Sequence, residues 1–176
     1  MVLKLFLFLK LFSFVSSLES KFKFLIIGHR GAASLAPENT LASFNAACEA
    51  GCAFLELDVH QLKIDDEKNE LIVIHDDTLE RTTNATGEVS KLRESDLINI
   101  QTENGQPIPY LKEVISLIKH RINVEKRTIG LNIELKGDHT GKLTAKYIQE
   151  ESSIPIIVSS FKHRELFEFR EIDKHT

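Results

Sequence analysis

Ala53-Phe54-Leu55-Glu56-Leu57-Asp58-Val59-His60 places two carboxylates one residue apart inside a short apolar segment. Side chains alternate between the two faces of a β-strand, so Glu56 and Asp58 share one face and the aliphatic residues share the other. Two carboxylates this close repel each other unless a proton or a cation lies between them. The segment therefore predicts a strand beside a metal ion. The alternative is an antiparallel strand with one solvated face.

Two further segments show the same arrangement. Leu131-Asn132-Ile133-Glu134-Leu135-Lys136 again places aliphatic residues on one face and polar residues on the other. The apolar run Phe24-Leu25-Ile26-Ile27 ends abruptly in Gly28-His29-Arg30-Gly31. Three strands that end in charged or imidazole groups predict one shared polar site, which weighs against the solvated-face alternative.

Composition excludes several classes of function. The chain has 176 residues, of which 42% are hydrophobic and 27% charged, with a formal net charge of −4. This balance is typical of one globular domain. The chain has no block of basic residues, which argues against a nucleic-acid partner. Cys48 and Cys52 have no second Cys or His pair nearby. We therefore interpret them as small buried apolar residues rather than zinc ligands.

An apolar N-terminal segment, residues 1–20, precedes the expected domain at 21–176. Residues 1–18 are rich in Leu and Phe and resemble a secretory signal cleaved after Ser17, which would make the protein exported or periplasmic. Lys10 interrupts the apolar run and favours an uncleaved segment, and hence a cytoplasmic protein. The run is too broken for a transmembrane helix.

Strands and helices alternate along the rest of the chain, apart from one β-hairpin at 54–74 with a polar turn at 65–69. This alternation predicts parallel strands joined by right-handed crossovers. We expect strands at 22–28, 54–63, 71–74, 129–135 and 154–159, helices at 41–51, 111–122, 140–151 and 162–176, and a long polar loop at 78–109. Four such units amount to half of a (β/α)8 barrel, whereas the chain length favours a four-stranded open parallel sheet.

Five motifs in this order resemble those of the glycerophosphodiester phosphodiesterase family, in its compact bacterial form. They are Gly28-His29-Arg30-Gly31-Ala32, Pro37-Glu38-Asn39-Thr40-Leu41, Glu56-Leu57-Asp58-Val59, His75-Asp76-Asp77-Thr78-Leu79-Glu80-Arg81-Thr82-Thr83 and Asn132-Ile133-Glu134-Leu135-Lys136. The resemblance runs from about residue 24 to residue 161. It implies an α/β fold of the (β/α)8 TIM-barrel type, of which this chain holds the N-terminal half.

The resemblance also implies an activity, which is the metal-dependent hydrolysis of glycerophosphodiesters to sn-glycerol 3-phosphate and an alcohol. It assigns one divalent cation to Glu56, Asp58 and Glu134. Carboxylate oxygens are hard ligands that suit Mg²⁺ or Ca²⁺ rather than a soft metal.

The remaining site residues follow from the same motifs. The resemblance makes His29 and His75 a general acid and base pair, because imidazoles titrate near neutral pH. It makes Arg30 and Lys136 the groups that hold the substrate phosphate. Glu38 either reaches the metal or its outer ligand layer, or hydrogen-bonds the loop and the helix start, which we favour.

Histidines outside these motifs carry no expected function. We expect His60 to lie near the rim of its strand, beyond Asp58. We expect the others to lie on the surface, namely His120, His139, His163 and His175.

Two alternative functions remain open. Because family barrels continue through four more strands, the chain is also interpreted as an inactive fragment or as one half of a split enzyme. A lysophospholipase D-like phosphodiesterase is the other alternative. In that case residues 1–18 would contact the membrane that carries the lysophospholipid.

Overall fold

The computed structural model describes residues 25–64, 69–149, 151 and 153–176. The expected signal segment at 1–20, its membrane contact, and most of the expected polar turn at 65–69 therefore lie outside the described residues. Within the part of the chain that is described, no helix is long and apolar enough to cross a membrane.

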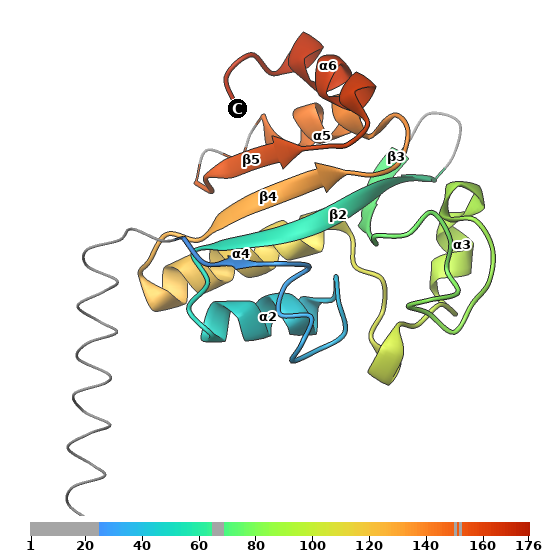
Figure 1. Ribbon diagram of the computed structural model, residues 1–176, viewed down its shortest axis with the longest axis horizontal. Helices are drawn as coiled ribbons and strands as arrows, with labels where there is room; N and C mark the ends of the chain where they lie inside the picture. The colour runs from blue at the N-terminus through green and yellow to red at the C-terminus, as the bar shows by residue number, and fades with distance from the viewer. Residues whose placement is uncertain (1–24, 65–68, 150, 152) are drawn as a thin grey trace, which may run out of the picture.

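One five-stranded sheet forms the centre of the molecule (Figure 1). Four strands run parallel in the order β1-β2-β4-β5, and β3 pairs antiparallel with the second half of β2. The expected hairpin and parallel strands are therefore confirmed. The strands are β1 (Ile27–Gly28), β2 (Phe54–Lys63), β3 (Asn69–Val73), β4 (Gly130–Leu135) and β5 (Ile156–Ser159).

A helix follows each parallel strand, as the alternating pattern predicts. The segment expected as a loop at 78–109 contains short helices as well. The long helices are α2 (Leu41–Glu49), α4 (Leu111–Glu125), α5 (Thr140–Ile148) and α6 (His163–Ile172). The short ones are η1 (Val89–Lys91), α3 (Glu94–Leu97) and η2 (Glu103–Gly105).

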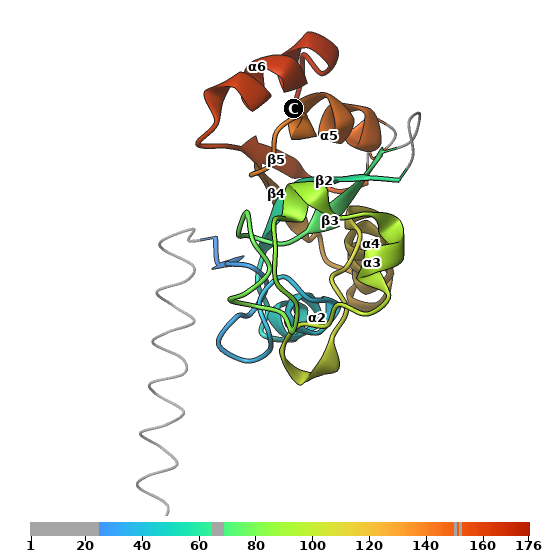
Figure 2. The same cartoon turned by 90° about the vertical axis from the view of Figure 1, so that its right-hand side faces the viewer.

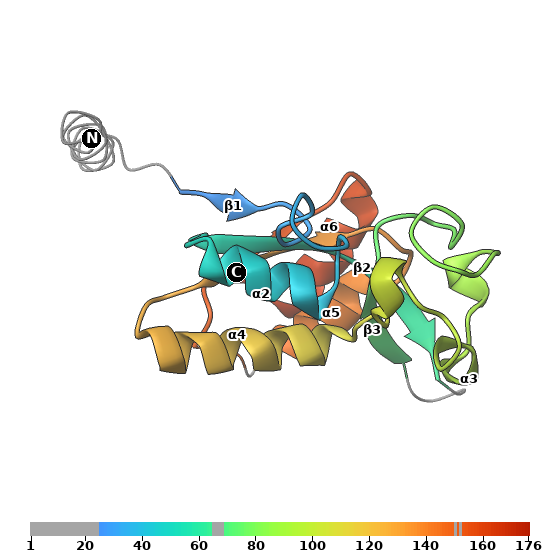
Figure 3. The same cartoon turned by 90° about the horizontal axis from the view of Figure 1, so that it is seen from below.

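The four long helices share one hydrophobic core with the sheet. Leu55, Leu57 and Leu131 are fully buried in it, together with Phe44 from α2 and Phe169 from α6. Figure 2 shows α5 and α6 at one end of the molecule and α2 and α4 at the other. Figure 3 shows α2 and α4 side by side along the sheet. The face of β2 that carries Leu55 and Leu57 is thus covered.

The opposite face of the sheet carries the polar residues and is less covered. Ile27 is paired with Phe54, and Ile157 with Asn132, so both isoleucines share this face with the acidic residues. They are 49% and 48% exposed. Our expectation of a buried strand at 22–28 is therefore wrong for its described part, because β1 is an edge strand that pairs only with β2 among the described residues.

The segment between β3 and α4 packs against the sheet through a second core. It stands at the end of the hairpin, beside the C-terminal ends of the parallel strands (Figures 1 and 3). The second core combines Leu62 of β2 and Ile72 of β3 with buried residues of the segment itself, which are Ile74, Leu79, Val89, Leu92, Ile100 and Ile108. Burial of these side chains explains why a long polar stretch is ordered without long helices.

The start of α2 fixes the loop that follows β1. Thr40 and Ser43 form a reciprocal capping box, in which each side chain accepts a hydrogen bond from the other's backbone N–H. Ser43 Oγ also donates to the carbonyl of Arg30 at 2.9 Å. Gly31 has φ 81°, and a Cβ there would lie 2.4 Å from Ser43 Oγ. Only glycine therefore fits between this loop and the helix.

Glu165 joins α5 to α6 in a similar way. It is buried, and its carboxylate accepts hydrogen bonds from the N–H groups of Gly141 at 2.9 Å and His139 at 3.2 Å. These donors lie at the start of α5, where the first N–H groups of a helix have no partner inside the helix. A Cβ on Gly141 would lie 2.1 Å from the carbonyl oxygen of Glu165.

We predict that Glu165→Ala lowers the free energy of unfolding by about 2 kcal/mol, because it removes a helix cap and leaves buried donors unpaired. Urea unfolding followed by circular dichroism measures the change. Glu171→Ala on the same helix is the control, since Glu171 is exposed and its ion pair with Lys142 contributes little. Equal losses in the two variants would contradict the capping role.

Candidate active site

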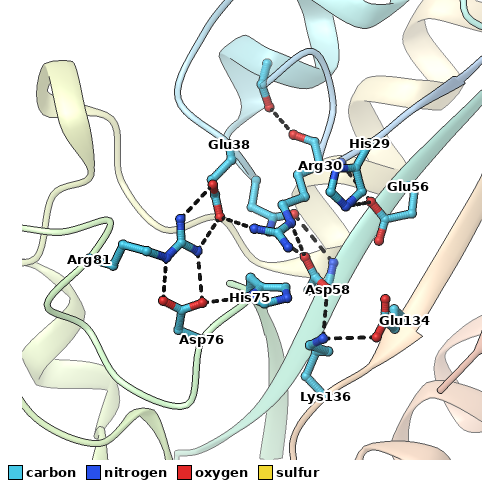
Figure 4. A network of polar contacts seen from close by, with 12 residues as sticks. His29, Arg30, Glu38, Glu56, Asp58, His75, Asp76, Arg81, Glu134 and Lys136 are labelled. Atoms are coloured by element: carbon cyan, nitrogen blue, oxygen red, sulfur yellow. Dashed lines mark hydrogen bonds and ion pairs between the residues drawn. The ribbon is translucent and has the colours of Figure 1, made fainter. Parts of the chain in front are cut away.

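Three carboxylates come together where β2 and β4 run side by side. Glu56 and Asp58 lie on β2, and Glu134 on β4 is the register partner of Asp58. Each offers an oxygen, and these oxygens all lie within 4.8 Å of one another. The parallel register thus places three acids at one point of the sheet, as Figure 4 shows.

The two acids of β2 are buried. Glu56 is 6% exposed and Asp58 is 1% exposed. The alternative of a solvated strand face is therefore wrong. Buried carboxylates require hydrogen bonds or compensating positive charge.

Asp58 has both hydrogen bonds and positive charge beside it. Asn39 Nδ2 donates to its Oδ2 at 2.8 Å, and the backbone N–H of Asp58 donates to Asn39 Oδ1 at 3.4 Å. Arg30 Nε lies 3.5 Å from Oδ2, and Lys136 Nζ lies 3.8 Å from Oδ1. Asn39 holds this position with φ 57°, a left-handed conformation that asparagine tolerates. The sequence motif that contains Asn39 gave it no role at the site, so its contact with Asp58 is a finding of the structure.

Glu56 is less well compensated. Its Oε2 accepts a hydrogen bond from the backbone N–H of Arg30 at 2.7 Å. Its Oε1 is buried and has no hydrogen-bond partner among the described residues. Burial raises the pKa of Glu56 to about 7, and the charges of Asp58 and Glu134 act in the same direction. The backbone N–H of Arg30 opposes this rise in pKa.

The two histidines approach the carboxylates from different loops (Figure 4). His29 follows β1, and its Nε2 lies 3.9 Å from Glu56 Oε2, with 71% of its side chain exposed. His75 follows β3, and its Nδ1 lies 2.6 Å from Asp76 Oδ1. The hydrogen bond from Arg81 holds the pKa of Asp76 well below its usual range. Asp76 is therefore ionised and accepts, so Nδ1 of His75 carries the proton and Nε2 is left for other partners.

Lys136 lies at the opening of the site. Its Nζ is 3.0 Å from Glu134 Oε1, and it stands over the ring of Phe161 at 5.9 Å. A pocket of about 360 Å³ lies here. It is lined by His75, Asp76, Asp77, Glu134, Leu135, Lys136, Phe161 and Lys162. Acidic, basic and aromatic groups therefore face one space.

The donor set fits a divalent cation. All three carboxylates are hard oxygen ligands, and the unpartnered Oε1 of Glu56 is a buried acceptor of the kind that a cation satisfies. Three carboxylates outnumber the two cationic side chains, Arg30 and Lys136, by one charge.

Residues 29–176 match the sequence profile of the glycerophosphoryl diester phosphodiesterase family. The chain belongs to this family. Its fold is accordingly a partial (β/α)8 barrel, as expected from the motifs, and the open-sheet alternative is not needed. Glu134 and Lys136 lie at the C-terminal end of β4, and His29 directly follows β1, which is where barrel enzymes carry their chemistry. Glu56 and Asp58 lie in the first half of β2, beside Asn132 and Glu134 of β4.

Three comparisons with known proteins illustrate the likeness. A glycerophosphodiester phosphodiesterase from Caldanaerobacter subterraneus is 32% identical and aligns with 87% of this chain and 64% of its own. Human lysophospholipase D GDPD1 is 30% identical, with 76% and 51% covered. The structure of an Oleispira antarctica phosphodiesterase in complex with the product sn-glycerol-3-phosphate matches with a TM-score of 0.73 at 27% identity. That match covers 86% of this chain and 63% of the other.

The chain spans about three fifths of the length of three bacterial relatives, between 61% and 64%. The family therefore identifies the fold and the group of proteins to which the chain belongs.

Glu38 makes one contact of the expected kind and one that is unexpected. Its carboxylate accepts from Arg30 Nη1 at 2.9 Å, on the loop after β1, and Arg30 in turn lies 3.5 Å from Asp58. It also accepts from both Nη atoms of Arg81. Arg81 lies 43 residues away on the segment after β3, so no local pattern reveals that contact.

His60 also departs from expectation. It is buried rather than at the strand rim, and its Nε2 donates to the carbonyl of His75 at 3.3 Å. Burial lowers its pKa, which keeps the ring neutral. The other histidines are exposed as expected, namely His120, His139, His163 and His175. Cys48 and Cys52 are buried free thiols, which agrees with their interpretation as core residues.

We predict that a divalent cation raises the thermal unfolding temperature more at pH 8 than at pH 5. A carboxyl whose folded-state pKa is raised stabilises the metal-free fold below its unfolded pKa near 4.3, and this stability is lost as pH rises to about 7. Above pH 7 the ionised Glu56 destabilises the metal-free protein, and a cation removes this cost. Calorimetry with EDTA, and with Mg²⁺ or Ca²⁺ in excess, measures the difference.

Glu56→Gln supplies the control for this experiment. Without the ionisable group, the metal-free variant should lose less stability between pH 5 and pH 7 than the metal-free wild type. Identical pH dependence in the two proteins would show that Glu56 ionises at its ordinary pKa.

Proposed function

We propose that the chain carries the site for metal-dependent hydrolysis of glycerophosphodiesters to sn-glycerol 3-phosphate and an alcohol. The observation that supports this most directly is the cluster of Glu56, Asp58 and Glu134, with cationic and imidazole groups around it. Such a set suits a phosphodiester, which needs charge compensation and two proton transfers.

Glu56, Asp58 and Glu134 would hold the divalent cation, Mg²⁺ or Ca²⁺. When bound, such an ion offsets the negative charge that builds at phosphorus. Asn39 would keep Asp58 oriented toward the site through its 2.8 Å hydrogen bond. The backbone N–H of Arg30 would do the same for Oε2 of Glu56, which leaves Oε1 free for the ion.

Proton transfer is assigned to His29 and His75. Because Asp76 engages Nδ1 of His75, its Nε2 is the nitrogen that can take or give a proton. His29 is largely exposed, so a substrate that lies against Glu56 can reach its ring. Removal of a proton from water and its delivery to the leaving alkoxide require two such groups.

Arg30 and Lys136 would bind the phosphate. The Arg30 side chain is mostly buried, and its Nε has no hydrogen-bond partner among the described residues. Lys136 borders the pocket and can approach the phosphate as a point charge. Phe161 beside it is 87% exposed and would face the alcohol portion.

We predict that the chain releases sn-glycerol 3-phosphate from glycerophosphocholine in the presence of Mg²⁺ or Ca²⁺, and that EDTA abolishes the release. Glu134→Gln should lower kcat/KM at least 100-fold by removing a metal ligand, on the order of the upper loss for groups around a metal. An enzyme-coupled assay for glycerol 3-phosphate measures both effects.

His29→Ala should be inactive in the same assay, whereas His120→Ala on the exposed side of α4 should keep wild-type activity. Release that persists with EDTA, or in His29→Ala, would contradict the assignment. Binding of the cation without turnover would favour the alternative of an inactive fragment or one half of a split enzyme. The exposure of Ile27 and Ile157 on the face that carries the acids favours that alternative.

A lysophospholipase D-like activity is the second candidate. The exposed ring of Phe161 at the pocket offers an apolar surface for the acyl chain of a lysophospholipid. We predict that Phe161→Ser lowers release of choline from lysophosphatidylcholine more than from glycerophosphocholine, if this candidate is correct. If the wild-type chain releases no choline from lysophosphatidylcholine, the lysophospholipase D-like activity is excluded.

A further inference from the structure

Arg81 joins two loops of the site that are far apart in sequence. It lies on the segment after β3, and Figure 4 shows it between Glu38 and Asp76, on the side away from Glu56 and Glu134. Its guanidinium donates to both of these carboxylates. The sequence motif that contains Arg81 gave this residue no role.

The contact with Asp76 connects Arg81 to His75. Arg81 Nε donates to Asp76 Oδ2 at 2.6 Å, and Arg81 Nη2 donates to Asp76 Oδ1 at 2.9 Å. The same Oδ1 accepts from His75 Nδ1 at 2.6 Å. Two parallel hydrogen bonds fix the plane of the Asp76 carboxylate, and that plane sets the direction in which the His75 ring points.

The contact with Glu38 connects Arg81 to Arg30. Arg81 donates through Nη1 to Glu38 Oε2 at 2.9 Å and through Nη2 to Glu38 Oε1 at 2.7 Å. That Oε1 also accepts from Arg30 Nη1 at 2.9 Å. The guanidinium of Arg30 is thus held from one side by Glu38, while its Nε lies 3.5 Å from Asp58.

We propose that Arg81 is a positioning residue that fixes His75 and Arg30 relative to each other through Asp76 and Glu38. The inference rests on the proposed function, in which His75 transfers a proton and Arg30 binds the phosphate. Among the described residues, the hydrogen bonds of Arg81 go to Asp76 and Glu38 and not to His75 or Arg30, so the effect passes through the two carboxylates.

The geometry requires arginine at this position. Four N–H groups of one planar guanidinium serve two carboxylates at once, which a lysine ammonium cannot do in the same orientation. The charge of Arg81 also separates two acids that would otherwise repel, and its hydrogen bonds lower the pKa values of Glu38 and Asp76.

A purely structural ion pair is the competing explanation. Arg81 is half-exposed, and ion pairs at such positions contribute little to stability because water screens them. A structural role would therefore change unfolding slightly and leave the orientation of His75 unchanged. The two explanations differ in what happens to the His75 ring and to kcat.

The test compares Arg81→Lys with Arg93→Lys in the full chain with Mg²⁺. Arg93 lies on the same segment, is exposed, and pairs only loosely with Asp96 at 3.6 Å. Hydrolysis of glycerophosphocholine gives kcat and KM. Nitrogen-15 labelling of histidine gives the Nδ1–H signal of His75 by NMR, which reports its hydrogen bond independently of activity.

We expect Arg81→Lys to lower kcat about 10- to 100-fold and to lose the His75 Nδ1–H signal, while Arg93→Lys changes neither. Two further variants separate the contacts. Asp76→Asn should reproduce the loss of kcat with little change in KM, and Glu38→Gln should mainly raise KM because it releases Arg30. Thermal unfolding of each variant shows that the fold is retained.

A retained His75 signal in Arg81→Lys would overturn the inference, whether or not the chain turns over substrate. A lost signal with unchanged kcat would also overturn it. If the signal is lost and the wild-type chain itself releases no glycerol 3-phosphate, the proposed function has failed while the positioning of His75 by Arg81 stands.

Discussion

Repulsion among three carboxylates, two of them buried, is the constraint on which the rest of the site depends. Glu56 and Asp58 share one face of β2 by strand periodicity, and the parallel register adds Glu134 from β4. Acids this close inside a protein need positive charge from elsewhere. The cationic groups Arg30 and Lys136 therefore have to be held at fixed places. The loop after β1 and the end of β4 have conformations that achieve this.

The backbone conformation and the hydrogen bonds of the loop after β1 place Arg30 beside the acids. Arg30 has φ 51° and Gly31 has φ 81°, which turns the backbone N–H of Arg30 toward Glu56 while its side chain runs toward Glu38 and Asp58. The capping box of α2 and the Ser43 hydroxyl hold that turn in place. One short loop thus places a backbone donor, a guanidinium and an imidazole around the acids. A glycine that fits only because it lacks a side chain makes this packing feasible.

The sequence predicted those parts of the site that follow from regular periodicity. The acidic faces of β2 and β4 follow from alternation within each strand, and the hairpin follows from a polar turn between two strand patterns. It could not predict contacts between loops. Arg81 reaches Glu38 across 43 residues, and no periodic pattern connects them. The burial of His60 depends on Gly137 after β4 and on the carbonyl of His75 after β3, and the exposure of β1 depends on its neighbours in the sheet. Such properties belong to the tertiary arrangement and not to any one segment.

The placement of the carboxylates and the alignment of a substrate depend on different parts of the structure. The carboxylates are fixed by the pairing of β2 with β4 and by a buried core, so the proposed cation site is built from packing within the described residues. Substrate alignment is different, because His29 and Phe161 are exposed, and Ile27 and Ile157 share the face that carries the acids. Hydrolysis in a water-filled site loses much of the benefit of its charges, since water screens them. Shielding of this face from water should therefore matter less for cation binding than for catalytic turnover.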